Sequence, residues 1–221
     1  MGKPGKFITF EGGDGSGKSS ALLRVYNYLM KAGYATYATS DPGGSDIGNQ
    51  IRNILLTVSN KGMSSKTELL LYQAARAELV HNVIKPALQN FDFVLCDRFH
   101  DSTAIYQGMI RGWPQTFLDE LHKTFSDDIQ PDHTLLFNVD AKIGLSRSLG
   151  DNKDEGRWEA EGLAIHTKIN DEFHNRALGH LLDRYAAGRF VIIDANQEME
   201  TMIDDVLFYI KNFILMGGSY A

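Results

Sequence analysis

Short apolar runs alternate along the chain with longer stretches in which polar and apolar residues are mixed. Several short runs are apolar throughout, such as residues 93–95 and 135–137. Continuous apolar runs are typical of strands that are buried on both faces of a sheet. The pattern predicts five strands, at residues 7–11, 35–39, 93–97, 133–139 and 189–194.

The longer stretches have the mixed character of amphipathic helices. They predict helices at residues 18–32, 68–90, 141–149, 159–187 and 198–213. Gly33 is a natural stop for the first helix, and Pro86 is expected to bend or restart the second. Strands that alternate with helices indicate an α/β fold with a mostly parallel sheet. A length of 221 residues fits one domain spanning residues 1–221.

The overall charge limits the classes of partner. The formal net charge is −6, which argues against a broad nucleic-acid surface. No apolar stretch reaches the ~18 residues of a membrane span, and residues 1–6 lack the apolar run of a signal peptide. A single cysteine, Cys96, fits a reducing compartment. We therefore expect a cytoplasmic protein that binds neither nucleic acid nor membranes.

Residues 12–19 match the phosphate-loop pattern G-x-x-x-x-G-K-[ST] throughout, between a predicted strand and a predicted helix. Glycines let backbone N–H groups turn around a phosphate, and the helix N-terminus adds partial positive charge. The alternative is a glycine-rich turn without a ligand. The residues expected to bind ATP here are Gly12, Gly13, Asp14, Gly15, Ser16, Gly17, Lys18, Ser19 and Ser20.

Two residues of this loop have specific expected roles: Lys18 reaches the β and γ phosphates, and the Ser19 hydroxyl binds Mg²⁺. A second motif follows the strand at 93–97, which ends in Asp97 and Arg98. Asp97 is expected to organise Mg²⁺ or its waters, and Arg98 is a forked donor suited to a second phosphate. The alternative for Asp97 and Arg98 is a surface ion pair.

The chain resembles thymidylate kinases from residue 7 to about residue 203. The segments that carry the resemblance are residues 11–19, 41–45, 72–77, 97–108, 131–132 with 139–140, and 193–195. The resemblance implies a P-loop NTPase three-layer sandwich, with a central parallel five-stranded sheet flanked by helices. It also implies transfer of phosphate from ATP to dTMP with Mg²⁺, and a homodimer formed through helices that include the one bearing Tyr72.

The resemblance further assigns an acceptor site. Tyr72 and Arg76, four residues apart on one helix face, would stack on thymine and donate to it. The alternative is a core aromatic residue beside a surface charge. The expected acceptor residues are Asp14, Asp41, Tyr72, Arg76, Arg98, Ser102, Thr103, Tyr106 and Gln107.

Several of these residues have a second reading. Asp14 would meet the sugar 3′-hydroxyl or simply shape the loop, and Asp41 would lie near Mg²⁺ or initiate a turn. Ser102 would line the site or cap a helix. His100, in the same segment, is expected to be exposed to solvent.

Some thymidylate kinases carry an arginine inside the phosphate loop, where this chain has Gly15. Phosphoryl transfer needs positive charge at the moving group. A basic lid at about residues 147–158 is the expected source, and the alternative is a solvated loop. Arg147 and Lys153 would bind the nucleotide, with Ala195 near the adenine, and Arg157 would act on the transferred group. The expected catalytic residues are Lys18, Arg157, Asp14 and Arg98.

Two rival functions remain open at this point. One is a monophosphate kinase with another or broader acceptor, such as dUMP, because a methyl group discriminates only ~10-fold to ~200-fold. The other is a P-loop regulatory NTPase, for which residues 152–155 superficially resemble a guanine-reading motif. That motif fails at Glu155.

Overall fold

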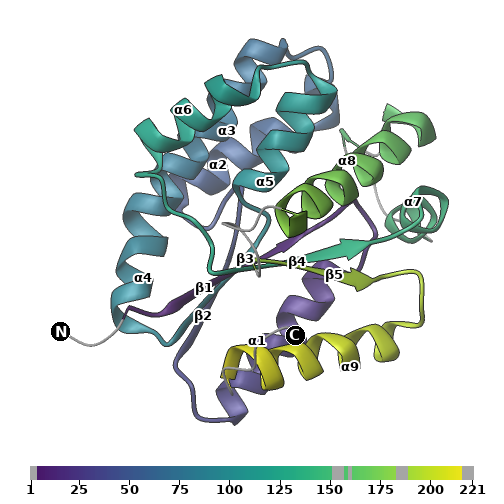
Figure 1. Ribbon diagram of the computed structural model, residues 1–221. Helices are drawn as coiled ribbons and strands as arrows, with labels where there is room; N and C mark the ends of the chain where they lie inside the picture. The colour runs from purple at the N-terminus through teal and green to yellow at the C-terminus, as the bar shows by residue number, and fades with distance from the viewer. Residues whose placement is uncertain (1–3, 151–156, 159–160, 183–188, 216–221) are drawn as a thin grey trace.

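The computed structural model describes residues 4–150, 157–158, 161–182 and 189–215. Five parallel strands form one sheet in the order β2-β3-β1-β4-β5 (Figure 1). All five predicted strands are confirmed, with ends shifted by at most one residue. Their bounds are β1 Lys6–Glu11, β2 Thr36–Ser40, β3 Phe93–Asp97, β4 His133–Asn138 and β5 Phe190–Asp194.

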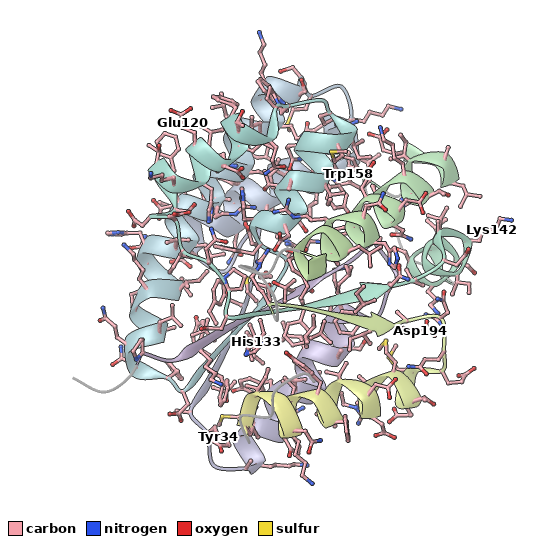
Figure 2. The ribbon with its side chains drawn as sticks, viewed as in Figure 1. Tyr34, Glu120, His133, Lys142, Trp158 and Asp194 are labelled. Atoms are coloured by element: carbon pink, nitrogen blue, oxygen red, sulfur yellow. The ribbon has the colours of Figure 1, made fainter. Side chains whose placement is uncertain are left out.

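The carboxyl ends of the strands meet along one edge of the sheet. Figure 2 labels His133 where β4 begins and Asp194 where β5 ends. In the register between β1 and β3, Phe10 lies beside Asp97, so the loops after these two strands begin next to each other. In open parallel sheets, ligands bind at this edge.

Helices cover both faces of the sheet (Figure 1). Their bounds are α1 Lys18–Lys31, α2 Asp46–Leu56, α3 Ser65–Leu79, α4 Lys85–Asn90, α5 His100–Thr103, α6 Gln115–Phe125, α7 Ala141–Leu149, α8 Leu163–Leu182 and α9 Met199–Tyr209. The α1–α9 pair packs on one face, for example Val25 and Val206 against Phe10. The other face carries α3 and α4 over β3 and α8 over β4 and β5. The expected three-layer sandwich is therefore confirmed.

The long helix predicted at 68–90 is in fact two helices that continue into each other. α3 begins at Ser65, because the Ser64 hydroxyl caps it by accepting from the Thr67 N–H at 3.2 Å. A π-helical turn at Val80–Ile84 follows, and Pro86 stands in the first turn of α4. Proline is tolerated there because a first-turn N–H has no partner within its helix.

Other helical boundaries differ from expectation. α8 begins at Leu163 rather than at residue 159, after Gly162 with a φ of 84°. The end predicted at residue 187 lies outside the described residues. α2 and α6 were not predicted from the sequence. Within the described residues, no helix is long and apolar enough to cross a membrane.

Candidate active site

The phosphate loop joins β1 to α1 at the carboxyl edge of the sheet. Gly17 has a φ of 84° and directly precedes α1. A left-handed backbone of this kind is open to glycine at little cost. Lys18, which is 7% exposed, donates from Nζ to the Gly13 carbonyl at 3.2 Å. The loop therefore presents a helix N-terminus and one buried ammonium to the same space.

The loop lies directly against the backbone of α7 at Gly15. A β-carbon on Gly15 would lie 1.8 Å from the Gly144 carbonyl oxygen, and Gly15 has a φ of 68°. Conversely, a β-carbon on Gly144 would lie 2.6 Å from the Asp14 carbonyl oxygen. No side chain fits at Gly15 unless α7 moves, so this backbone excludes an arginine at that position.

Ser19 and Asp97 form a pair suited to a divalent cation. The Ser19 hydroxyl donates to Asp97 Oδ2 at 2.5 Å, and Asp97 Oδ1 is buried without a hydrogen-bond partner in the described part of the chain. Mg²⁺ is usually held by one or two carboxylates, waters and substrate phosphates rather than by a full protein cage. This fits the finding that the described residues contain no group of three or more metal-ligating side chains.

A cavity of about 280 Å³ opens beside the loop. Of the predicted site residues, those that line it are Asp14, Lys18, Ser19, Asp41, Tyr72, Arg76, Asp97, Arg98, Ser102, Thr103, Tyr106, Gln107 and Arg157. They come from the phosphate loop and the start of α1, from α3, and from the end of β3 with the segment that follows it; Asp41 follows β2, and Arg157 precedes α8. The structure thus brings the predicted acceptor residues together beside Lys18.

Arg98 joins the two motifs. Its NH2 donates to Asp14 Oδ1 at 2.7 Å, and its NH1 donates to the Gly12 carbonyl at 3.0 Å and to the Ser102 hydroxyl at 3.2 Å. Burial alone would raise the pKa of Asp14, but Arg98 and Lys18 outweigh it and lower that pKa. Asp14 is therefore an anion positioned between two cations.

Arg76 is built into the cavity wall. It is 1% exposed, and it donates to Asp41 Oδ2 and to the Thr103 hydroxyl, each at 2.6 Å. This burial overturns the alternative in which Arg76 is a surface charge. Its NH1 is buried without a partner among the described residues.

Aromatic side chains close another side of the cavity. The rings of Tyr106 and Trp158 meet edge to face with centroids 4.7 Å apart. Trp158 Nε1 donates to the Tyr72 hydroxyl at 3.3 Å, and the Arg111 guanidinium lies 4.4 Å from the Trp158 ring centroid. Such a wall offers apolar area to a flat base.

Arg157 is held in a buried ion pair. Its NH1 lies 2.7 Å from Glu68 Oε2, and its Nε donates to the Leu55 carbonyl at 2.7 Å. Glu68 also accepts from Gln107 at 3.0 Å and from Arg111 at 3.4 Å. The structure therefore places Arg157 at the cavity wall beside Glu68, rather than in an exposed lid.

The other lid residues lie apart from this cavity. Arg147, on α7, donates to the Ala195 carbonyl at 2.7 Å and to the Gln197 carbonyl at 3.3 Å. This places Arg147 and Ala195 side by side beyond the end of β5. Lys153 lies outside the described residues.

The family model for thymidylate kinase matches residues 10–206. A thymidylate kinase of Oleidesulfovibrio alaskensis is 39% identical over 217 residues, which cover 96% of this chain and 100% of that protein. One from Geobacter sulfurreducens is 40% identical over 92% of this chain and 96% of its own length. One from Bacillus pumilus is 35% identical over 94% of this chain and 96% of its own length.

The chain belongs to the thymidylate kinase family. In the segment at residues 97–108, one expectation is wrong and one of two alternatives is excluded. His100 is buried, not exposed: its ring stacks on His122 at 4.1 Å, and its Nε2 lies 3.1 Å from Asp119 Oδ1. Ser102 does not cap α5, because it is the third residue of that helix.

The thymidylate kinase cavity also contains residues that were not predicted from the sequence. Arg52 and Leu56 come from α2, and Ser40 and Pro42 precede that helix. Arg52 NH1 donates to the Pro42 carbonyl at 2.6 Å, which turns the side chain toward the cavity. The signal that could have revealed α2 is present in the sequence, because Ile47, Ile51, Ile54 and Leu55 recur at helical spacing. Trp158 falls inside the segment predicted as a lid, and its side chain lines the cavity.

Proposed function

We propose that this chain transfers the γ-phosphoryl group of ATP to dTMP, giving ADP and dTDP in the supply of dTTP. The observation that carries the proposal is one cavity in which a phosphate loop and a second set of guanidinium groups meet around Lys18 and Arg98. Membership of the thymidylate kinase family supports the same activity. A different acceptor or a regulatory NTPase is not favoured.

ATP would bind with its phosphates against the phosphate loop. The loop N–H groups and Lys18 would bind its phosphates, because a helix N-terminus and an ammonium both stabilise anions. Its adenine would lie near Ala195 and Arg147, which meet beyond β5. Residues 151–156 of the proposed lid lie outside the described residues, so Lys153 and the lid itself stay predictions, as does a single domain over 1–221.

Ser19 and Asp97 would hold Mg²⁺. The ion would neutralise charge on the phosphate oxygens when bound. The orphaned Asp97 Oδ1 supports this assignment, because a buried carboxylate oxygen without a donor is suited to a cation or its waters.

The acceptor would lie in the cavity beside the aromatic wall. Arg98 and Arg52 would bind its phosphate as forked donors, and Asp14 would accept from the sugar 3′-hydroxyl. Tyr72 would stack on the base, and the free Arg76 NH1 would donate to thymine O4. A donor at that position favours thymine or uracil over cytosine, because cytosine carries an amino group there.

The remaining predicted residues would shape this acceptor site. Thr103 and Gln107 are already engaged by Arg76 and Glu68, so they would orient these groups. Ser102 and Tyr106 flank Arg98 and would fix its plane.

Catalysis would rest on positioning and charge stabilisation without a covalent intermediate. Lys18, Arg98 and Asp14 would align the two substrates. Arg157 lines the same cavity and would add positive charge, although Glu68 now holds it.

Two further predictions concern the whole chain. We propose that it forms a homodimer through α2 and α3, the latter bearing Tyr72. Large apolar side chains are exposed on these helices, including Ile47, Ile54 and Leu70. A cytoplasmic location stays a prediction.

Coupled measurement of ADP release tests the activity, with ATP and each of dTMP, dUMP, dCMP, dGMP and dAMP. Release is expected to be fastest with dTMP and to fall by at least ~10-fold with dUMP, within the range that one methyl group gives. Lys18→Ala is the control that removes the loop cation. ADP release that does not depend on any monophosphate would overturn the kinase proposal.

A further inference from the structure

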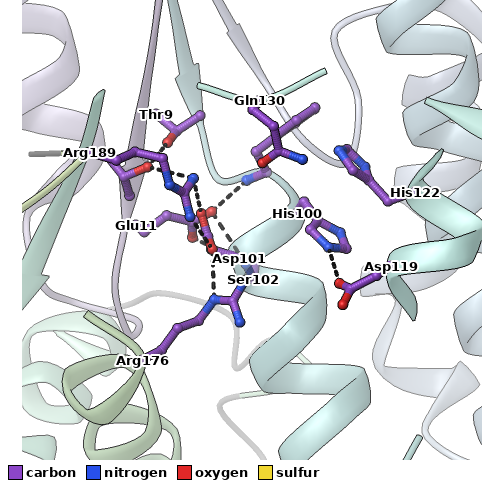
Figure 3. A network of polar contacts seen from close by, with 12 residues as sticks. Thr9, Glu11, His100, Asp101, Ser102, Asp119, His122, Gln130, Arg176 and Arg189 are labelled. Carbon is purple, nitrogen blue, oxygen red and sulfur yellow. Dashed lines mark hydrogen bonds and ion pairs between the residues drawn. The ribbon is translucent and has the colours of Figure 1, made fainter. Parts of the chain in front are cut away.

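One fully buried carboxylate lies between the two motifs without lining the cavity. Glu11 ends β1 and is 0% exposed. Its Oε1 accepts from the Phe99 N–H at 2.7 Å and the Ser102 N–H at 3.3 Å, and its Oε2 accepts from the Ser102 hydroxyl at 2.6 Å. Figure 3 shows Glu11 beside Ser102 and Asp101.

These donors belong to the turn that carries Arg98. Arg98 has a φ of 68°, a left-handed conformation that costs a non-glycine residue about 1 kcal/mol or more. Its N–H donates to the Phe10 carbonyl at 2.9 Å, one residue before Glu11. The end of β1 therefore holds this strained turn at three points, Arg98, Phe99 and Ser102.

Glu11 also substitutes for a helix cap. Phe99 precedes α5, and its side chain cannot cap the helix because it has no hydrogen-bond acceptor. The Phe99 N–H donates to Glu11 instead, and the Ser102 N–H is shared between Glu11 at 3.3 Å and the Phe99 carbonyl at 3.1 Å. A negative charge at this place is favourable, because it lies at a helix N-terminus. Glu11 thereby fixes where the helix begins and how the chain leaves Arg98.

The Ser102 hydroxyl connects Glu11 to the guanidinium itself. A serine hydroxyl has one proton, and it points to Glu11 at 2.6 Å. Its oxygen is then left to accept from Arg98 NH1, which lies 3.2 Å away. Glu11 thus sets the acceptor to which one arm of Arg98 is bound, while Asp14 holds the other arm.

We propose that Glu11 is a positioning residue for the acceptor's phosphate, holding Arg98 in its binding orientation through the turn at 98–102 and the Ser102 hydroxyl. This rests on the proposed function, in which Arg98 binds that phosphate. Glu11 touches neither substrate in this arrangement.

The charge on Glu11 supports a role beyond structure. Burial, and then the neighbouring Asp101, raise the pKa of Glu11 to about 7. A buried carboxylate is a costly means of holding a turn, because it must give up its hydration. Asp101 in turn accepts from Arg176 at 2.7 Å and from Arg189 at 3.0 Å, so its own charge is compensated (Figure 3).

Calorimetric binding of dTMP, thymidine and ADP to Glu11→Gln tests the proposal. The dissociation constant for dTMP is expected to rise about ten-fold or more, as when a charged hydrogen-bond acceptor is lost. Thymidine, which lacks the phosphate, and ADP are expected to bind within two-fold of wild type. Glu120→Gln, which removes the same charge at an exposed position on α6, is the matched control (Figure 2).

Equal weakening of dTMP and thymidine, or unchanged dTMP binding, would overturn the proposal. Arg98→Ala separates this inference from the proposed function. If Arg98→Ala leaves dTMP binding unchanged, the proposed role of Arg98 is wrong. If it weakens dTMP binding and Glu11→Gln does not, only the Glu11 inference is overturned.

The double variant tests the route. If Glu11 acts through Arg98, then Glu11→Gln combined with Arg98→Ala binds dTMP no more weakly than Arg98→Ala alone. A further independent loss contradicts this route. If Glu11→Gln does not fold, Ser102→Ala replaces it, because this variant removes only the hydroxyl link. Ser102→Ala must then weaken the binding of dTMP while it leaves the binding of thymidine unchanged.

Discussion

At the scale of single residues, the site is a set of buried charges whose partners lie far apart in the sequence. Glu11 and Phe99 are 88 residues apart, yet the Phe99 N–H donates to Glu11 at 2.7 Å. Glu11 belongs to a motif that the sequence reveals, but its role does not follow from that motif. Periodicity identifies a strand end, whereas the contact depends on how β1 and β3 pair.

Glu11 should make the stability of the fold depend on pH. Burial and Asp101 raise its pKa from 4.5 to about 7 in the folded protein. The folded state therefore holds more protons than the unfolded state between these values, and the unfolding free energy falls as pH rises through this window. Glutamine does not titrate, so the unfolding free energy of Glu11→Gln should rise by about 3 kcal/mol relative to that of the wild type as the pH increases through this window.

Denaturant unfolding at several pH values between 4 and 8 measures this difference. Glu120→Gln is the surface control, since that side chain is exposed. Parallel curves for wild type and Glu11→Gln would show that the Glu11 carboxyl does not titrate in this range.

At the scale of elements, the strands were predictable and the junctions between helices were not. The apolar runs of β1 and β3 are visible in the sequence because both faces of these strands are covered. α2 is short, but its apolar residues Ile47, Ile51, Ile54 and Leu55 recur at helical spacing, so this helix was within reach of the sequence pattern. The π-helical turn between α3 and α4 depends on backbone packing and has no signature in residue type.

The junction of α2, α3 and the segment before α8 is held by Arg157. Removing one partner of a buried ion pair typically costs about 3–5 kcal/mol. Arg157→Ala should lower the unfolding free energy by about 3 kcal/mol, at the low end of this range. The loss is limited because Glu68 keeps its contacts with Gln107 and Arg111. Arg24→Ala is the control: it breaks an exposed pair with Glu200 and should cost less than about 1 kcal/mol.

The same variant tests the catalytic proposal for Arg157. At a temperature where Arg157→Ala is folded, its kcat is expected to fall by ~10³-fold if Arg157 acts on the transferred phosphoryl group. A kcat within a few-fold of wild type would leave Arg157 with its structural role alone.

At the scale of the whole molecule, a chain of net charge −6 must accept two anionic substrates. It does so by local concentration, because Lys18, Arg52, Arg76, Arg98 and Arg157 all line one cavity. The loop and the strand end were predictable from motifs, since each motif is contiguous. Arg52 was missed because nothing in α2 marks it as facing the same space.

The proposed dimer also belongs to this scale. Light scattering after gel filtration is expected to give twice the mass of one chain for the wild type. Ile54→Asp combined with Leu70→Asp should give one chain, because both exposed side chains would lose apolar contact and gain charge. Phe208→Asp on α9, at the other face of the sheet, is the control. A wild type that elutes as one chain contradicts the dimer.

The contact between Gly15 and Gly144 restricts how this enzyme can change over evolution. Any side chain at position 15 meets the α7 backbone at 1.8 Å, so substitution there is blocked until that helix is displaced. A change at position 15 therefore requires a simultaneous change in the path of α7. A mutant library that varies position 15 alone should return glycine, whereas one that also rebuilds the α7 segment opens the way to an arginine in the loop.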